Sequence, residues 1–248
     1  MKHMNNLFAV TTIAKYTVCP SQVYLELVLG KRIYEFTDAM NLGQYYHDVR
    51  CRFNDQINRN IANTSFEKER LFRDSIYKTF HYAEISNFSS SLIDYVKTLD
   101  NRTNQEITKH DKFPLLENEF SLRSEKYNLA GRLDALVNYH DSAIPWDYKT
   151  HNDPIFSEYD EMQILLYCLL LKENNYKKPE LGIVDYVDIG QQKQVKFNSS
   201  NNKRILKLLD TVHNMIKTKD IPNLFQCKYY HYNGNCIHCH NLSCEVSI

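Results

Sequence analysis

Residues 130–149 of this 248-residue chain read AGRLDALVNYHDSAIPWDYK. The stretch has the alternation of two paired β-strands around a turn at residues 140–142. Asp134 lies on the first predicted strand, and Asp147 and Lys149 lie on the second. Positions two apart on a strand face the same side of a sheet, so Asp147 and Lys149 share a face. The stretch therefore predicts a sheet that presents two carboxylates and a lysine together.

The two carboxylates indicate a site for a divalent metal. Adjacent strands bring Asp134 and Asp147 close together. Two close carboxylates repel, so a cation between them stabilises the pair. Oxygen ligands suit Mg²⁺ or Mn²⁺, which polarise a phosphate and lower the pKa of a bound water. Lys149 is placed to hold or activate that water, although a D-x-K pattern also arises by chance.

The elements around this hairpin predict an α/β fold. A strand at residues 117–124 precedes it, a helix capped by Ser157 follows at residues 157–171, and residues 181–187 and 192–197 form a second hairpin. We also expect helices at residues 11–29 (capped by Thr11 or Thr12, stopped by Gly30 and broken at Pro20), 39–60, 65–99 and 199–219. This order predicts a small mixed sheet flanked by helices, with a helical N-terminal part.

Gln163 and Tyr167 share one face of the helix predicted at residues 157–171, because they are one helical turn apart. A glutamine in such an apolar stretch needs a polar partner. For Tyr167 alone, packing in the core is the simpler interpretation.

The cysteines form a second candidate site. Cys236-x-x-Cys239-x4-Cys244 lies near the end of the chain, a spacing typical of metal binding. Four thiolates suit either tetrahedral zinc or an iron–sulfur cluster. The fourth ligand is Cys227 nearby, which would complete a zinc module, or the distant Cys19. Spacing alone slightly favours zinc.

The composition argues against a strongly basic DNA-binding protein and against a membrane-spanning protein. Lys+Arg and Asp+Glu both number 30, so any affinity for DNA must come from a local patch rather than a global basic field. Lys203, Arg204 and Lys207 are candidates, and a solvated helix face explains them equally well. No stretch approaches the roughly 20 apolar residues that span a bilayer, and residues 1–8 lack the pattern of a signal peptide.

We therefore expect a cytoplasmic protein without membrane contact. A reducing compartment disfavours disulfides, which agrees with the odd number of cysteines, 7. Cys51 and Cys168, on predicted helices, are expected in the core.

The motifs, taken in order, resemble the RecB-like branch of the PD-(D/E)XK nucleases. The matching patterns are Gly43-x-x-x-His47, Gly131-x-x-Asp134, Asp147-Tyr148-Lys149-Thr150 and Gln163-x-x-x-Tyr167. The resemblance implies four metal ligands, namely His47, Asp134, Asp147 and the carbonyl of Tyr148. It also implies that Lys149 serves the water, and that Gln163 and Tyr167 shape the substrate side. Without it, His47 reads as an ordinary surface or capping histidine. His151 stands where the family often has glycine, which leaves the ligands intact.

The cysteine pattern resembles the CRISPR-associated exonuclease family within that branch. There, a Cys-Pro step near the N-terminus joins three C-terminal cysteines around a [4Fe-4S] cluster. The resemblance implies the ligands Cys19, Cys236, Cys239 and Cys244, with Cys227 spare. Ser21, in place of a basic residue, and the x4 spacing depart from the family pattern and keep zinc as the alternative. Such a cluster would stabilise the fold by closing a long loop.

The resemblance implies a metal-dependent DNA exonuclease that acts on single-stranded ends and processes spacer DNA beside CRISPR integrase proteins. The alternatives are a free-standing RecB-like repair or viral exonuclease, and a cluster-bearing DNA-binding subunit with an idle nuclease site. A zinc-bearing binding module with an accidental D-x-K is a third alternative, against which the ordered series of motifs argues.

We expect one nuclease domain over residues 1–248. It comprises a helical part with the first cluster cysteine (residues 1–110), a PD-(D/E)XK core (residues 111–220) and a cysteine-rich, cluster-binding tail (residues 221–248).

Overall fold

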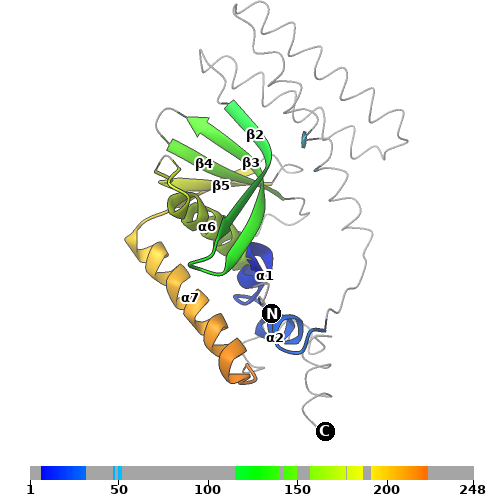
Figure 1. The fold of residues 1–248 in the computed structure, drawn as a ribbon. Coiled ribbons are helices and arrows are strands. Elements are labelled where there is room, and N and C mark those ends of the chain that lie inside the picture. Colours follow the sequence, from blue (N-terminus) through cyan, green and yellow to red (C-terminus); the bar gives the residue numbers. More distant parts are fainter. Residues whose placement is uncertain are drawn as a thin grey trace, which may run out of the picture.

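The computed structural model describes residues 7–31, 47, 50–51, 115–139, 142–149, 157–176, 178–186 and 191–222. These residues form a six-stranded mixed sheet flanked by helices, which confirms the predicted α/β class (Figure 1). The strands are β1 (Phe8–Ala9), β2 (Leu115–Ser124), β3 (Leu129–Tyr139), β4 (Ser142–Lys149), β5 (Leu181–Tyr186) and β6 (Gln191–Lys196). The helices are α1 (Val10–Lys15), α2 (Pro20–Leu27), α6 (Glu158–Glu173) and α7 (Ser199–Thr218).

β3 pairs with three other strands of the sheet. It pairs with β2 along one edge, and with β1 and β4 along the other. β4 then pairs with β5 in parallel, and β5 pairs with β6 as an antiparallel hairpin. A parallel pair needs a crossover connection, and α6 supplies it between β4 and β5. The chain therefore carries α6 directly across the sheet, beside the ends of β3 and β4.

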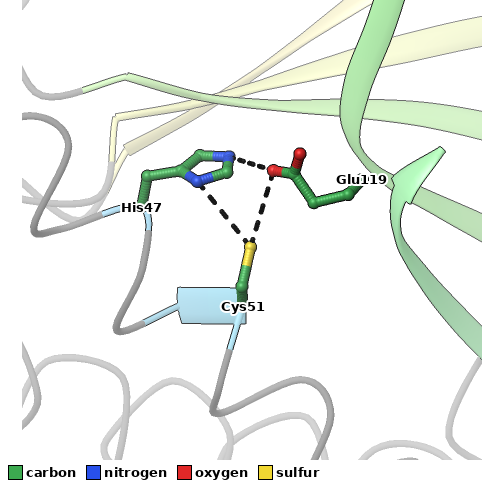
Figure 2. Close-up of side chains that lie close together, drawn as sticks. All are labelled: His47, Cys51 and Glu119. Atoms are coloured by element: carbon green, nitrogen blue, oxygen red, sulfur yellow. Dashed lines mark hydrogen bonds and ion pairs between the residues drawn. The ribbon is translucent and has the colours of Figure 1, made fainter. Parts of the chain in front are cut away.

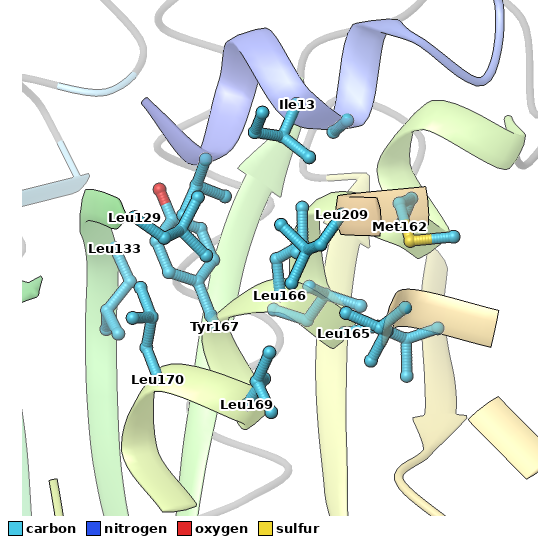
Figure 3. Packing of buried hydrophobic residues seen from close by; sticks show 14 of the residues in the cluster. Ile13, Leu129, Leu133, Met162, Leu165, Leu166, Tyr167, Leu169, Leu170 and Leu209 are labelled. Atoms are coloured by element: carbon cyan, nitrogen blue, oxygen red, sulfur yellow. The ribbon is translucent and has the colours of Figure 1, made fainter. Parts of the chain in front are cut away.

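α6 is the buried centre of the described fold, since it lies between the sheet and α7 and also contacts α1 (Figure 1). Every residue from Met162 to Leu171 is buried, as expected for a helix that is covered all round. Figure 3 shows Ile13, Leu133 and Leu209, from three different elements, packed around this helix. The polar side chains of α6 are thus held in place by closely packed apolar side chains. No described helix has the length and hydropathy needed to cross a membrane.

The helix boundaries show what local signals capture. Residues 11–29 form two short helices, as predicted, with Pro20 at the first position of α2. The predicted cap at Thr11 or Thr12 is wrong: Ala9 is the N-cap and offers no side-chain hydrogen bond, because the chain passes directly from β1 into α1. The predicted cap of α6 is confirmed, since Ser157 Oγ accepts a 3.0 Å hydrogen bond from the backbone N–H of Asp160. The helices predicted at residues 39–60 and 65–99 lie outside the described residues, apart from residues 47, 50 and 51.

The ladder between β2 and β3 is irregular at one place. The pairing omits the positions of Glu119 and Asp134, although it continues in the same register on both sides. Glu119 has φ 54°, in the left-handed region that non-glycine residues rarely occupy. The strained position is thus directly beside Asp134.

Gly131 allows α1 and α6 to approach β3. A Cβ atom there would lie 2.7 Å from Val10 Cγ2 and 2.8 Å from Tyr167 Cε1. We expect Gly131→Ala to lower the free energy of unfolding by about 1–3 kcal/mol, the usual cost of overpacking a core. Urea unfolding measures this loss. The double variant with Val10→Ala should lose less than the sum of the single losses, and additive losses would contradict the proposed clash.

The backbone of Glu119 gives a second prediction about stability. At positive φ glycine is tolerated better than alanine, so Glu119→Gly should be more stable to urea than Glu119→Ala by about 1 kcal/mol. Both variants lose the same side-chain contacts, so their difference isolates the backbone. Ser121, on the same strand, is the matched control: its φ is not positive, and there alanine should be the more stable substitution. The same order at both positions would contradict a strained Glu119.

Candidate active site

Asp134 and Asp147 meet where β3 and β4 separate. The ladder runs as far as Ala135 opposite Trp146, which makes Asp134 and Asp147 the next positions in register. Asp134 Oδ2 accepts a 2.7 Å hydrogen bond from the backbone N–H of Tyr148. The structure thus brings the two predicted carboxylates together and ties one of them to the backbone of β4.

Asp147, Lys149 and Gln163 form a closed set of contacts. Lys149 Nζ lies 2.8 Å from Asp147 Oδ2 and donates a 2.9 Å hydrogen bond to Gln163 Oε1. Gln163 Nε2 donates a 2.9 Å hydrogen bond to Asp147 Oδ1. The polar partners that were expected for Gln163 are therefore the acid Asp147 and the base Lys149. Both groups of the amide are used, which fixes its orientation on α6.

The charges of this set are held in an interior environment. Asp147 is 2% exposed, and burial raises its pKa to about 7, with Lys149 lowering it and Asp134 raising it. Burial lowers the pKa of Lys149, but Asp147, Tyr159 and Asp160 together outweigh burial, and the net shift is upward. Two carboxylates that repel in a desolvated place are a suitable site for a divalent cation. The oxygen donors present fit Mg²⁺ or Mn²⁺.

His47 lies beside Asp134. Its Nε2 is 2.9 Å from Asp134 Oδ1. The same atom is 3.0 Å from Glu119 Oε1 (Figure 2). The hydrogen bonds to Asp134 and then to Cys51 raise the pKa of His47 to about 11, against the lowering effect of burial. Without a metal, the imidazole is therefore a cation between two acids. After loss of that proton, Nε2 is a nitrogen donor in the same place.

Two residues of this site, Glu119 and Cys51, were not predicted from the sequence to lie here. Cys51 Sγ lies 3.7 Å from His47 Nδ1 and 3.8 Å from Glu119 Oε1, and these three side chains could hold a metal ion (Figure 2). The prediction that Cys51 packs in the core is wrong, since it is only half-buried. One signal was present: Cys51 is one helical turn after His47 and shares its face. For Glu119 the signal was the hairpin register, which sets it opposite Asp134. Glu119 Oε2 also contacts Arg132 Nε at 2.5 Å.

Tyr167 lies next to the site and packs as a core residue. Its ring is 2% exposed, and its hydroxyl donates a 2.8 Å hydrogen bond to the backbone carbonyl of Arg132. Burial raises the pKa of Tyr167 far above its ordinary value, so the hydroxyl stays protonated. Tyr167 therefore fixes the β3 backbone just before Asp134. On the neighbouring strand, the ring of Tyr148 lies 4.9 Å from the guanidinium of Arg50.

The remaining predicted residues lie away from this site or outside the described residues. Cys19 is fully buried as the N-cap of α2, whereas Cys227, Cys236, Cys239 and Cys244 lie outside the described residues. Cys168 is buried in α6, as expected for a core residue. Arg204, a candidate DNA contact, forms ion pairs with Glu158 and Glu161 that join α7 to α6. Of that candidate patch, Lys203 and Lys207 are exposed.

Comparisons with known proteins give the family. The crystal structure of SSO0001 aligns with 94% of this chain and 87% of its own, at 14% identity and a TM-score of 0.36, which is too low to support an argument. No curated protein matches the chain. The family model of the PD-(D/E)XK nuclease superfamily matches residues 7–245. This chain therefore belongs to the PD-(D/E)XK nuclease superfamily, whose members are metal-dependent nucleases.

Proposed function

We propose that this protein is a Mg²⁺- or Mn²⁺-dependent deoxyribonuclease that acts as an exonuclease on single-stranded DNA ends. The observation that carries the proposal is the contact set of Asp147, Lys149 and Gln163 beside Asp134 and His47. A purely structural ion pair would not need a second carboxylate and a histidine at its edge. The set supplies what phosphodiester hydrolysis requires, namely anionic metal ligands and a cation next to them.

His47, Asp134, Asp147 and the carbonyl of Tyr148 would hold the metal, and Glu119 adds one more carboxylate within reach of His47. A divalent cation bound there would polarise the scissile phosphate and lower the pKa of the attacking water. Lys149 holds that water in line for attack, and Gln163 keeps the ammonium of Lys149 in place. Tyr167 supports this arrangement because its hydroxyl holds the backbone of β3 at Arg132.

The substrate and the setting rest on the sequence pattern. The likeness to the CRISPR-associated exonucleases favours DNA with single-stranded ends, and processing of spacer DNA beside integrase proteins. Exposed Lys203 and Lys207 would contact the DNA backbone. The free-standing repair or viral exonuclease uses the same residues, and the two settings differ only in partners.

The catalytic role of Lys149 can be tested on end-labelled single-stranded DNA with Mn²⁺. Lys149→Ala should lower the cleavage rate at least about 100-fold, because positioned acid–base and charge effects contribute that much or more. Lys178→Ala is the matched control, since Lys178 is 85% exposed and pairs only loosely with Glu180, at 3.6 Å. Its rate should equal that of the wild type.

Equal cleavage by Lys149→Ala and the wild type would refute the assignment of Lys149. If neither the wild type nor the variants cleave, the protein is instead a DNA-binding subunit with an idle site. Asp134→Asn separates these cases further, because it should abolish cleavage that depends on Mn²⁺ and leave DNA binding intact.

We also propose that Cys19 and three C-terminal cysteines hold a [4Fe-4S] cluster, on a single nuclease domain with a cysteine-rich tail. Cys19 supports this as a buried thiol fixed at the start of α2 by Pro20. A zinc module built with Cys227 is the competing proposal. In either case thiolate ligands couple metal binding to folding.

Metal analysis of anaerobically purified variants distinguishes the cluster from zinc. The wild type should contain iron and acid-labile sulfide. Cys19→Ser should lose both and Cys227→Ser should keep both, because Cys19 is one of the four proposed ligands and Cys227 is not. Cys168→Ser controls for the general effect of removing a buried thiol. Zinc without iron, lost in Cys227→Ser and kept in Cys19→Ser, would overturn the cluster.

A further inference from the structure

Asp160 is a buried carboxylate that the proposed mechanism does not use. It lies in the first turn of α6 and is 0% exposed. Its Oδ2 accepts a 3.0 Å hydrogen bond from the hydroxyl of Tyr186 on β5. Its Oδ1 accepts no hydrogen bond from any described residue and lies 3.8 Å from Lys149 Nζ. A buried carboxylate with an unused oxygen is costly unless a nearby charge compensates it.

Helix capping does not explain this placement. Ser157 already caps α6, and it does so through the backbone N–H of Asp160 rather than through the side chain. Acids favour the first turn of a helix because of its dipole. Glu158 and Glu161 supply this effect in the same turn, from less buried positions. The side chain of Asp160 could be exposed and still stabilise the helix end, so its burial against Lys149 needs another explanation.

The occupied oxygens of Asp147 suggest what that explanation is. Gln163 donates to Oδ1, and Lys149 Nζ lies 2.8 Å from Oδ2, so a cation at Asp147 would meet the ammonium of Lys149 at close range. The amide of Gln163 is fixed from both sides, whereas the lysine is the flexible partner. An ammonium that leaves Asp147 needs another anion, and Oδ1 of Asp160 is within 3.8 Å. The ring of Tyr159, 5.4 Å from Nζ, borders the same space.

We propose that Asp160 is a positioning residue that takes over the ammonium of Lys149 when Asp147 binds the catalytic cation. Lys149 then keeps its hydrogen bond to Gln163 and exchanges one carboxylate for another. Tyr186 orients Asp160 for this exchange through its hydrogen bond to Oδ2. Asp160 acts only through Lys149 and touches neither the cation nor the substrate. This inference rests on the proposed function, because it assumes a cation at Asp147.

The consequence can be measured as cation affinity. Without Asp160, Lys149 has no second carboxylate, so it stays on Asp147 and competes with the cation. Asp160→Asn should therefore raise the dissociation constant for Mn²⁺ about tenfold, within the range of couplings between contacting residues. In the Lys149→Ala background the same substitution should change the constant less than about twofold, since the competing ammonium is gone.

Isothermal titration of the full-length protein with Mn²⁺ measures these four dissociation constants. Glu161→Gln is the matched control, because it removes a neighbouring acid of α6 that pairs with Arg204 rather than with Lys149. Its constant should match the wild type. At saturating Mn²⁺, Asp160→Asn should lower kcat on single-stranded DNA and leave KM unchanged, because only the position of Lys149 is altered.

Equal Mn²⁺ affinity of Asp160→Asn and the wild type would overturn the inference. The inference would also be overturned if Asp160→Asn weakened Mn²⁺ binding equally in the wild-type and Lys149→Ala backgrounds. Asp160 would then act on the cation directly rather than through Lys149. If urea unfolding shows that Asp160→Asn is not folded, Tyr186→Phe takes its place in the experiment. Tyr186→Phe should weaken Mn²⁺ binding roughly two- to threefold, and Lys149→Ala should abolish this weakening. A wild type that binds no Mn²⁺ overturns the proposed function and this inference together, whereas the other outcomes leave the function standing.

Discussion

The ion pair between Lys149 and Asp147 is the contact on which the site depends. Both side chains leave the same face of β4, and α6 covers that face, so the pair is largely removed from water. A buried ion pair stabilises a protein only when further hydrogen bonds satisfy its atoms. Gln163 provides them on both sides, with its carbonyl on the lysine and its amide on the acid. One residue of α6 thus fixes the geometry of two residues of β4.

The position of α6 is in turn set by the topology and by two glycines. The parallel step from β4 to β5 requires a crossover, and α6 is that crossover. Gly131 and Gly182 let the helix come close to the sheet, since a Cβ atom at Gly182 would lie 2.5 Å from Ile164 Cγ1. Ile164 follows Gln163 directly. The same close approach that packs the core therefore brings Gln163 into hydrogen-bonding distance of Asp147.

Features that depend on local pattern could be predicted from the sequence. The strand alternation around the Asp134 hairpin, the break at Pro20 and the cap at Ser157 all involve neighbours in the chain, and the structure contains each of them. The pairing of Lys149 with Gln163 was less direct, because it needed the helix to lie on the correct face. The sequence predicted that Gln163 has a polar partner, but it did not identify that partner.

The residues that were missed depend on distant parts of the chain. Glu119 reaches the site only through the register of β2 on β3 and through a left-handed backbone angle, which an alternating strand pattern does not predict. Cys51 was assigned to the core because cysteines are usually buried, whereas its neighbours are His47 and Glu119. Tyr186 and Asp160 meet from two elements separated by 26 positions. Such contacts follow from the tertiary fold alone.

The basic residues of the site neutralise only part of its negative charge before any metal binds. His47 lies between Asp134 and Glu119, and Lys149 lies near Asp147 and Asp160, so each basic residue has two acids within 4 Å. Four carboxylates against two bases leave an excess of negative charge that suits a divalent cation, and a cation at Asp147 would also compete with the ammonium of Lys149. Metal binding here would thus be coupled to loss of the His47 proton and to movement of the Lys149 ammonium, whereas a thiolate cluster that joins distant segments would be coupled to folding.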